Sequence, residues 1–301
     1  MNNEIIHRGP DSEGTFSYVE NGNTIGVGMR RLSIIDVENG NQPFFSNDKK
    51  LILVFNGEIY NYQQLRNSLI EKFSINFSTS SDTEVILHLY DKYGEKSFGM
   101  LDGMFVFALI DKRKDKLFIA RDFFGEKPLY YINNSNSIFW ASELKSIKKV
   151  IDKKLTLSKQ AISLYFQLTY IPAPFSIYEE VFKLEPYNFL KINLNSLDVK
   201  TKKINNQLNK KNIDYKNLSF DEAKKINHDL VIKSVESRLI SDVPIGTFLS
   251  GGVDSSIISL CASKIKKTSI DTFSIGFDKG SFDETEKSKL VSKLISSNHH
   301  E

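Results

Sequence analysis

The segment Leu249-Ser250-Gly251-Gly252-Val253-Asp254-Ser255-Ser256 stands between a predicted strand, residues 245–249, and a predicted helix, residues 255–265. Glycines there let the backbone turn sharply and approach a bound anion, toward which free N–H groups and the helix dipole point. The serine hydroxyls add donors, and Asp254 is a candidate ligand for a Mg²⁺ ion that accompanies a phosphate. A capped turn without a ligand is the simpler interpretation. The full pattern and its strand–helix setting favour a phosphate or pyrophosphate site.

The elements on either side of this segment predict one βαβ unit of a parallel sheet. A long amphipathic helix, residues 221–240, precedes it, and a further strand, residues 272–277, follows. A parallel sheet must be covered on both faces, which two strands alone do not achieve. We therefore expect residues 219–301 to be the first part of a larger α/β domain. Residues 201–218 are rich in Lys and Asn with few apolar side chains, and they are the predicted linker.

Short strands and a few helices are predicted for residues 1–200. Strands are expected at residues 24–35, 51–58, 104–110, 117–121, 128–132 and 137–141, with a hairpin near residues 189–192. Asn61 and Asp82 stand where N-caps would start two helices, and residues 158–166 predict a third. Because several strands follow one another without helices between them, the sheets are expected to be antiparallel and the domain to be α+β.

Composition excludes several classes of function. The 40 basic and 37 acidic residues leave a net charge of +3, which gives no argument for nucleic acid or an anionic membrane as a partner. No apolar run is long enough to cross a bilayer, and Met1-Asn2-Asn3-Glu4 lacks the layout of a signal peptide. The one cysteine, Cys261, excludes an internal disulfide framework and a Cys-rich zinc site. A cytoplasmic location is the expectation.

The loop at residues 249–256 matches the Ser-Gly-Gly-x-Asp-Ser-Ser signature of PP-loop ATP pyrophosphatases. Further segments resemble asparagine synthetase, in the same order along the chain: His7-Arg8-Gly9-Pro10-Asp11, Arg31-Leu32-Ser33-Ile34-Ile35-Asp36, Asn56-Gly57-Glu58-Ile59-Tyr60-Asn61, Ser81-Asp82-Thr83-Glu84-Val85-Ile86, Asp102-Gly103-Met104-Phe105, Arg121-Asp122-Phe123-Phe124-Gly125, Lys127-Pro128-Leu129-Tyr130 and Ser142-Glu143. The chain thus resembles the glutamine-hydrolysing asparagine synthetase family along essentially its whole length.

This resemblance implies a fold and a domain order. Residues 1–200 would form a class II glutamine amidotransferase domain, an Ntn-type αββα sandwich that lacks its first strand. Residues 201–218 would be the linker. Residues 219–301 would be the N-terminal part of an ATP pyrophosphatase domain with a Rossmann-like PP-loop fold.

The resemblance also implies site residues. Arg31 would bind the carboxylate of glutamine, Asp82 its ammonium group, and Asn56 with the Gly57 N–H would form an oxyanion hole. The remaining glutamine-pocket residues would be Leu32, Ser33, Ile34, Ile35 and Glu58. ATP would contact Leu249, Ser250, Gly251, Gly252, Asp254, Ser255, Ser256 and the backbone at Ile275. ATP and Mg²⁺ are the implied cofactors, and Asp254 is the candidate Mg²⁺ ligand.

Simpler interpretations exist for the same residues when the resemblance is set aside. Arg31 reads as a surface ion-pairing side chain, Asp82 as a helix cap, and Asn56-Gly57 as a hairpin turn. Cys261 reads as a small buried apolar residue. The five histidines are dispersed or face apart, so they predict no metal cluster.

Members of the family begin with Met-Cys-Gly, and removal of Met frees the cysteine that attacks glutamine. Here Met1 is followed by Asn2, and the His-Arg-Gly-Pro-Asp segment already begins at His7. We therefore expect the catalytic nucleophile, its strand and the far part of the synthetase domain to be absent from residues 1–301. Glutaminase activity is not expected from these residues alone.

The reaction implied for the intact family converts aspartate, glutamine and ATP into asparagine, glutamate, AMP and pyrophosphate. Two alternatives stay open at this point. One is a non-catalytic remnant that binds nucleotide or a partner. The other is a relative that amidates another carboxylate, for example in surface-polysaccharide synthesis. A second copy of the chain or a complementing fragment is the expected protein partner.

Overall fold

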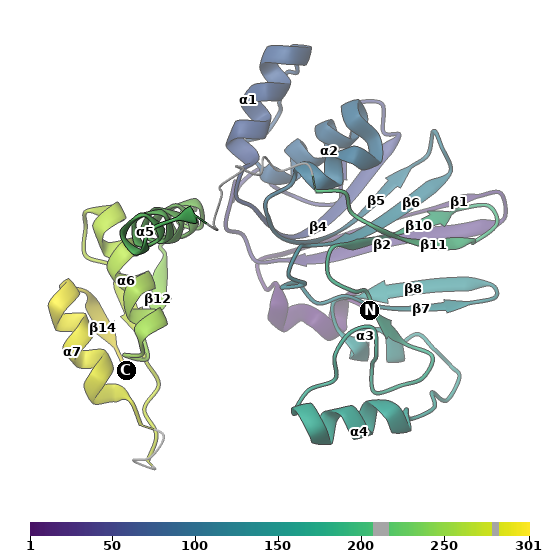
Figure 1. Ribbon diagram of the computed structural model, residues 1–301. Helices are drawn as coiled ribbons and strands as arrows, with labels where there is room; N and C mark the ends of the chain where they lie inside the picture. Colours follow the sequence, from purple (N-terminus) through teal and green to yellow (C-terminus); the bar gives the residue numbers. More distant parts are fainter. Residues whose placement is uncertain (207–216, 279–282) are drawn as a thin grey trace. The chain divides into compact units, whose positions relative to one another are not determined.

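The computed structural model describes residues 1–206, 217–278 and 283–301, which belong to two compact units (Figure 1). Unit 1 spans Met1–Asn209 and unit 2 spans Lys210–Glu301. The last strand of unit 1 ends at Lys203, whereas residues 207–216 of the predicted linker lie outside the described residues. The domain limits of the sequence analysis stay predictions.

A six-stranded antiparallel sheet is the centre of unit 1. Its strands, in spatial order, are β11 (Val199–Lys203), β10 (Asn188–Asn193), β6 (Lys116–Arg121), β5 (Gly103–Asp111), β4 (Leu51–Ile59) and β3 (Phe44–Phe45). The apolar run of β4 is buried on both faces from Leu51 to Phe55, and β5 is buried from Phe105 to Asp111. Such continuous runs fit strands that are covered on both sides.

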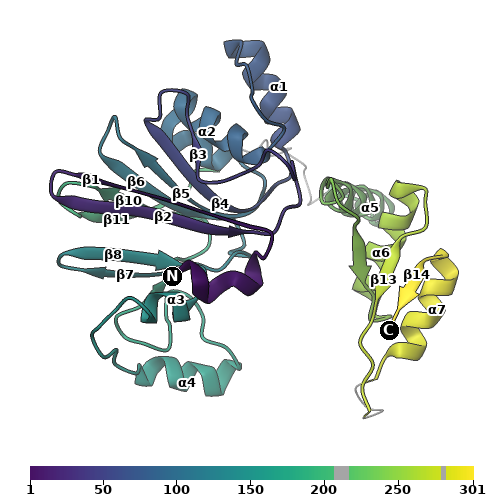
Figure 2. The ribbon, with the colours of Figure 1, turned by 180° about the vertical axis from the view of Figure 1, so that it is seen from behind.

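Two smaller antiparallel sheets form a second layer. One is the hairpin of β1 (Ser12–Glu20) and β2 (Asn23–Arg31), and the other has the order β8 (Ser137–Ala141), β7 (Tyr130–Asn134) and β9 (Phe182–Lys183). Side chains of both sheets share one apolar core with the large sheet, including Ile25 and Val27 from β2, Ile52 and Val54 from β4, and Ile138 and Trp140 from β8. The three sheets therefore make a sandwich, which Figure 2 shows from behind.

Helices cover both outer faces of the sandwich (Figure 1). On the large sheet lie α1 (Tyr62–Phe73), α2 (Asp82–Tyr93) and the 3-10 helix η2 (Gly94–Met100), and on the small sheet lie α3 (Leu144–Lys148) and α4 (Lys159–Leu168). Tyr90 of α2 packs on Phe118 and donates a 2.9 Å hydrogen bond to the buried Asp111 carboxylate. Ile147 of α3 packs with Ile132 and Val181. The predicted α+β sandwich with αββα layers is confirmed.

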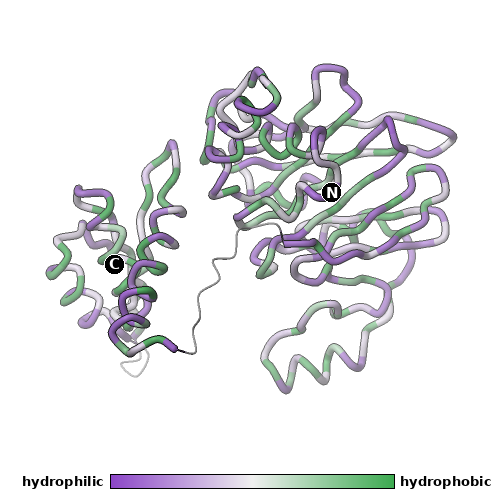
Figure 3. Tube along the Cα trace, turned by 45° about the horizontal axis from the view of Figure 1, so that its top comes forward, coloured by the Kyte–Doolittle hydropathy of each residue, from purple (hydrophilic) through white to green (hydrophobic). Residues whose placement is uncertain are grey.

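In its described residues, unit 2 is a three-stranded parallel sheet with three α-helices. The elements follow as α5 (Phe220–Ser237), β12 (Gly246–Phe248), α6 (Val253–Lys266), β13 (Asp271–Phe273), α7 (Thr285–Ile295) and β14 (Asn298–His300), and the sheet order is β12-β13-β14. The predicted βαβ unit is therefore confirmed. Its core is small, centred on Val235, Ala262 and Ile270. Figure 3 shows hydrophobic and hydrophilic positions interspersed along this unit.

Several predicted boundaries were wrong. The strand expected at residues 24–35 ends at Arg31, because the following residues turn around the Arg31 guanidinium. The strand expected at residues 272–277 ends at Phe273. The hairpin strand β1 and the lysine-containing helix α3 were not predicted.

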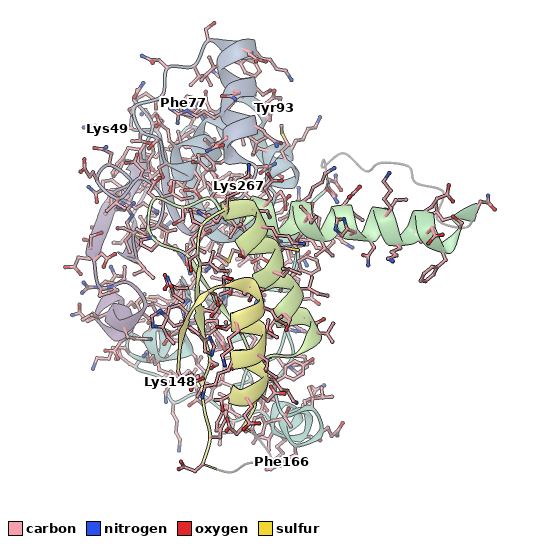
Figure 4. The ribbon with its side chains drawn as sticks, turned by 90° about the vertical axis from the view of Figure 1, so that its left-hand side faces the viewer. Lys49, Phe77, Tyr93, Lys148, Phe166 and Lys267 are labelled. Carbon is pink, nitrogen blue, oxygen red and sulfur yellow. The ribbon has the colours of Figure 1, made fainter. Side chains whose placement is uncertain are left out.

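Phe166 at the end of α4 is 81% exposed (Figure 4).

The predicted cap Asp82 was wrong, whereas Asn61 is the N-cap residue of α1 as predicted, although its side chain makes no capping hydrogen bond. Ser81, not Asp82, caps α2 through a hydrogen bond from the Thr83 N–H at 3.2 Å. The side-chain amide of Asn61 donates to the Met100 carbonyl and accepts from the N–H of residue 102, so it does not bond the backbone of α1. The Asp82 carboxylate is therefore not used as the cap of α2. Among the described residues, no helix is long and apolar enough to span a membrane.

Candidate functional site

A pocket of about 430 Å³ lies in unit 1 between β2, β4 and the first turn of α2. Eight of the residues that the sequence predicted for glutamine line it: Arg31, Leu32, Ile34, Ile35, Asn56, Gly57, Glu58 and Asp82. Ser33 is not among the lining residues, and its N–H donates to the Asp11 carboxylate at 2.8 Å. The volume suits a small molecule with a few polar groups. Segments far apart in the sequence therefore meet at one concave site.

Gly57 sits where β4 passes close to β5. Its φ is +152°, and a Cβ at this position would lie 2.0 Å from the Met104 carbonyl oxygen and 2.7 Å from the Phe105 Cα. Only glycine fits such an approach. The positive φ of Gly57 lies directly beside Asn56, which also lines the pocket. An amide side chain next to a distorted backbone N–H is a suitable donor pair for a developing oxyanion.

The Arg31 side chain is buried at the pocket wall and organises the turn that follows β2. Its guanidinium donates to the carbonyls of Val37 at 3.0 Å, Ile35 at 3.0 Å and Asp36 at 2.7 Å. Burial lowers the pKa of Arg31, and the charges of Asp36 and Asp82 oppose that shift. The guanidinium thus shapes the turn while it places positive charge at the pocket.

Asp36 holds the other side of this turn. It has φ of +49°, and its carboxylate accepts from the Ser80 N–H at 2.8 Å and the Asn39 N–H at 3.1 Å. Burial acts to raise the pKa of Asp36, but the hydrogen bonds from Ser80 and Asn39 outweigh it and lower the pKa. The turn after β2 is therefore tied to the segment that leads into α2.

Two carboxylates share the pocket. Asp82 is 4% exposed, and its Oδ2 accepts from the Ile59 N–H at 3.0 Å. Burial raises the pKa of Asp82 to about 6, and the charge of Glu58 adds to the shift, against the hydrogen bonds from Ile59, Thr83 and Ser81. Burial also raises the pKa of Glu58, while the charge of Lys127 lowers it. Perturbed carboxyl groups in a cleft are typical of functional sites.

Sequence reasoning assigned no role to four residues that build this pocket. Gln42 joins two walls, because its Oε1 accepts from the Phe55 N–H at 2.7 Å and its Nε2 lies 3.4 Å from the Thr83 hydroxyl. A Cβ on Gly40 would lie 2.3 Å from the Arg31 guanidinium. Asp36 and Lys127 belong to segments that resemble the family, which was the available signal; Gln42 and Gly40 gave none.

A second, larger cavity of about 940 Å³ adjoins the pocket. The two share the lining residues Arg8, Met29, Arg30, Phe55 and Asn56. Strands β2 and β8 both line it. In the described residues, β8 pairs only with β7. Strand β2 pairs only with β1, apart from one bridge between residues 10 and 31. Protein interiors hold few voids larger than a water molecule. This volume therefore has room for a polypeptide segment between two strand edges.

The glycine-rich loop of unit 2 connects the end of β12 to the start of α6. Gly251 has φ of +79°, and a Cβ there would lie 2.5 Å from the Lys287 Cβ and 2.7 Å from the Ser288 N. The Ser250 hydroxyl lies 3.0 Å from that of Ser255, and accepts from the Gly252 N–H at 3.3 Å. The loop is therefore packed against α7 by a glycine and closed by its own serines.

The remaining ATP candidates gather at the same edge of the sheet. The Ser256 Oγ is buried, and no hydrogen-bond partner for it is found among the described residues. Asp254 is exposed in the first turn of α6. Ile275 follows β13 and is 73% exposed. Because β12 and β13 are parallel neighbours, both segments leave the sheet at its carboxyl edge, where α/β folds place their ligands.

Two family models match the chain. A model described as a glutamine amidotransferase domain matches residues 1–203, and one described as asparagine synthase matches residues 228–301. The chain belongs to the glutamine-hydrolysing asparagine synthetase family. The resemblance that the sequence motifs indicated is thereby confirmed, and the family is one of enzymes.

Among curated relatives, the chain is 40% identical to a putative asparagine synthetase 2 of Methanocaldococcus jannaschii, over all of this chain and 60% of the relative. It is 40% identical to asparagine synthetase 1 of Bacillus subtilis, over 98% of this chain and 45% of the relative. The chain thus spans about half the length of these relatives. A solved structure of glutamine phosphoribosylpyrophosphate amidotransferase from B. subtilis is 18% identical with a TM-score of 0.47, over 90% of this chain and 60% of that one.

Proposed function

We propose that unit 1 binds L-glutamine and that the loop of unit 2 binds the phosphates of ATP, as parts of a ligase that moves the amide nitrogen of glutamine to an activated carboxylate. The relatives named asparagine synthetase support aspartate as that carboxylate. The observation that carries the proposal is the pocket itself, because segments around residues 31, 57 and 82 converge on it.

The charges of the pocket match those of a zwitterionic amino acid. Arg31 supplies positive charge for the α-carboxylate, and Asp82 supplies negative charge for the α-ammonium group. Asn56 and the Gly57 N–H would stabilise the oxyanion that forms at the side-chain carbonyl, where one donor is worth about 10²–10³ in rate. Glutamine therefore binds with its reacting amide directed at β4.

Hydrolysis of glutamine also needs a nucleophile. The chain's one cysteine, Cys261, belongs to α6 of unit 2, so residues 1–203 contain none. In this proposal the nucleophile reaches the pocket on an extended strand from outside residues 1–301 that fills the adjoining cavity. Within the described residues, β8 pairs only with β7, and β2 only with β1 apart from the bridge at residue 31, so each strand has an edge with which it would pair. Its end would lie at Asn56 and Met29, which line both cavities.

The residues of the unit 2 loop fit a nucleotide. Gly251 allows close approach of the backbone, and the hydroxyls of Ser250, Ser255 and Ser256 offer donors to phosphate oxygens. Asp254 is the loop's carboxylate, and it would hold a Mg²⁺ ion that neutralises phosphate charge. The backbone at Ile275 would meet the adenine.

Calorimetry on residues 1–301 tests the proposal. L-glutamine and MgATP should each bind with a stoichiometry of one and without competing with each other, because the two sites belong to different units. D-glutamine is the control for L-glutamine, and phosphate buffer without nucleotide is the control for MgATP. Absence of glutamine binding at millimolar concentrations, in protein that unfolds cooperatively, would refute the assignment of the pocket.

A further inference from the structure

The five histidines of the chain differ in how far their side chains are buried. The side chain of His299, on β14, is 10% exposed. That of His88 on α2 is 20% exposed, and the other three are between 54% and 69% exposed: His7 on the 3-10 helix η1 (Asn2–Arg8), His228 on α5 and His300 on β14. Burial of an imidazole is unfavourable unless its ring nitrogens find hydrogen-bond partners. The partners of His299 therefore show what this side chain holds in place.

The ring of His299 joins β14 to two other elements of unit 2. Its Nδ1 lies 2.9 Å from the hydroxyl of Thr272 on β13. Its Nε2 lies 3.2 Å from the hydroxyl of Ser274, which follows β13, and 3.4 Å from the hydroxyl of Ser288 on α7. Residues from three successive parts of the chain thus meet at one imidazole.

The neighbours of Nε2 decide the direction of its hydrogen bonds. The Ser288 hydroxyl donates to the Thr285 carbonyl at 2.8 Å, so its oxygen is left to accept from His299. The Glu301 carboxylate, 3.5 Å from Nε2, also offers acceptors. Nε2 therefore carries a hydrogen, which it shares between the hydroxyls of Ser274 and Ser288.

Ser274 stands directly before the proposed adenine contact. Its backbone N–H donates to the His300 carbonyl at 2.9 Å, and its hydroxyl lies against His299. Strand β14 therefore binds both the N–H and the hydroxyl of Ser274. The next residue, Ile275, is exposed, and its backbone is the part of this segment proposed to meet the adenine.

Ser288 stands behind the proposed phosphate loop. It is fully buried, and a Cβ on Gly251 would lie 2.7 Å from its backbone nitrogen. The loop therefore packs directly on the turn of α7 whose hydroxyl His299 binds. A shift of Ser288 would move the surface against which Gly251 rests.

We propose that His299 is a positioning residue of the nucleotide site: its Nε2–H holds the hydroxyls of Ser274 and Ser288, and so fixes the spacing between the segment at Ile275 and the loop at Gly251. The inference rests on the proposed ATP site and names a residue to which no role was assigned there. Because its ring nitrogens are already bound within the protein, His299 acts through the two serines and not on the nucleotide itself.

The spacing matters only for a ligand that contacts both segments. ATP would meet the backbone at Ile275 with its adenine and the loop at Gly251 with its phosphates. Inorganic pyrophosphate would meet the loop alone. Loss of the His299 bonds should therefore weaken ATP binding more than pyrophosphate binding. A role in stability alone would weaken both ligands by the same factor, because it would only lower the folded fraction.

The test compares His299→Asn with His299→Gln in residues 1–301. The amide of Asn takes the place of Nδ1 and reaches Thr272, whereas the longer Gln places its amide near Nε2 and donates to the serines. Calorimetry should give a Kd for MgATP about five- to tenfold higher in His299→Asn, as expected for two lost neutral hydrogen bonds. In His299→Gln the Kd should stay within about twofold of the parent.

His300→Gln is the matched control. It changes the adjacent imidazole, which bonds Asp271 at 2.9 Å and stacks on Phe273, and it keeps the backbone carbonyl that binds Ser274. Its Kd for MgATP should stay within about twofold of the parent. Equal losses in His299→Asn and His299→Gln would overturn the inference, since the bonds of Nε2 would then not decide affinity.

Two further measurements separate positioning from a merely structural role. Phosphorus-31 NMR should show that His299→Asn changes the Kd for magnesium pyrophosphate by less than about twofold; a loss as large as that for MgATP would contradict the proposal. In a double-mutant cycle, Ser274→Ala should weaken MgATP binding in the parent and add little to His299→Asn. Fully additive effects would show that His299 does not act through Ser274.

Hydrogen exchange in the ligand-free protein makes the test independent of ATP. Exchange should quicken in His299→Asn at the amides of Ser274 and Gly252, both of which are hydrogen-bonded, and return to the parent rate in His299→Gln. If the parent binds no MgATP, the proposed function fails, and exchange alone decides the role of His299. If the parent binds MgATP and His299→Asn binds it equally well, only the inference about His299 fails.

Discussion

The carboxylate of Asp82 accepts a hydrogen bond from the backbone N–H of Ile59 at 3.0 Å, which joins the first residue of α2 to the last residue of β4. The contact holds the acid in the wall of the pocket, where it is almost fully buried. An ionised carboxylate there is poorly solvated until an ammonium group arrives. Burial of the ionised Asp82 carboxylate is therefore unfavourable in the ligand-free pocket, and a zwitterionic ligand would offset this free energy.

Asp82→Asn should make unit 1 more stable at neutral pH. The pKa of Asp82 is about 6 in the folded protein against 3.8 for the unperturbed group, so the folded state binds the proton more tightly. Stability from this group is present below pH 3.8 and is lost as the pH rises to 6, by about 3 kcal/mol at most. Asparagine can still accept from the Ile59 N–H and carries no charge.

Urea unfolding at pH 4 and pH 7.5 measures the free energy of unfolding of the parent and of the variant. The fluorescence of Trp140, the chain's one tryptophan, reports on unit 1. The gain in unfolding free energy of the variant over the parent should be larger at pH 7.5. An equal gain at both pH values would show that Asp82 does not titrate as described. The same variant should lose L-glutamine binding, because the ammonium group loses its counter-charge.

Gly57→Ala should unfold or strongly destabilise unit 1, by at least about 3 kcal/mol. The new Cβ would meet the Met104 carbonyl within the β4–β5 pairing. Gly22→Ala is the matched control, since Gly22 has φ of +79° but nothing within 4 Å; it should cost only about 1 kcal/mol. Similar losses in the two variants, measured by urea unfolding, would mean that backbone strain and not the close approach decides.

Arg31→Lys should raise the Kd for L-glutamine at least about tenfold, because an ammonium cannot bond three carbonyls and a carboxylate in the same plane. Hydrogen exchange should also quicken at residues 35–37. Arg66→Lys is the control: Arg66 also binds a carbonyl, that of Thr79 at 2.7 Å, but does not line the pocket. If Arg31→Lys binds glutamine as the parent does, Arg31 has no part in recognition.

Gly251→Ala should weaken MgATP binding at least about tenfold, because its Cβ would collide with the backbone at Lys287 and Ser288 and displace the loop. Gly252→Ala should cost less. Gly252 has ordinary φ of −71°, and its Cβ would lie 3.4 Å from the Ser250 hydroxyl. Calorimetric titration of both variants decides this, and an equal or larger loss in Gly252→Ala would contradict the described packing of the loop.

Much of the fold was predictable because its signals are local. The apolar run of residues 51–55 predicted a buried strand, and the turn at residues 249–256 predicted a strand–loop–helix unit; both are present. Strand β1 was missed because its half-buried positions include the polar Ser12 and Glu20 whereas the apolar Val19 is exposed, so its sequence carries little hydrophobic contrast. The strand predicted for residues 24–35 was too long because its end is set by the Arg31 guanidinium, a contact that no local pattern reveals.

The candidate site was predictable through the family motifs and not through residue patterns. Arg31, Asn56 and Asp82 alone favoured an ion pair, a turn and a helix cap, yet all three line one pocket. The contributions of Gln42 and Lys127 depend on tertiary contacts, in which Gln42 accepts from the Phe55 N–H and the Lys127 N–H donates to the Asp122 carboxylate. Such contacts join residues more than ten positions apart or lie in irregular turns, where sequence periodicity carries no information.

The central claim is that the pocket at Arg31, Gly57 and Asp82 binds L-glutamine. Amide NMR spectra of residues 1–301 recorded during titration with L-glutamine, and in parallel with D-glutamine, test it most directly. The amides of Ile35, Gly57 and Glu58 should shift in a saturable way with the L-enantiomer and not with the D-enantiomer. Saturating L-glutamine that leaves these amides unmoved, or that moves only residues outside the pocket, would contradict the account.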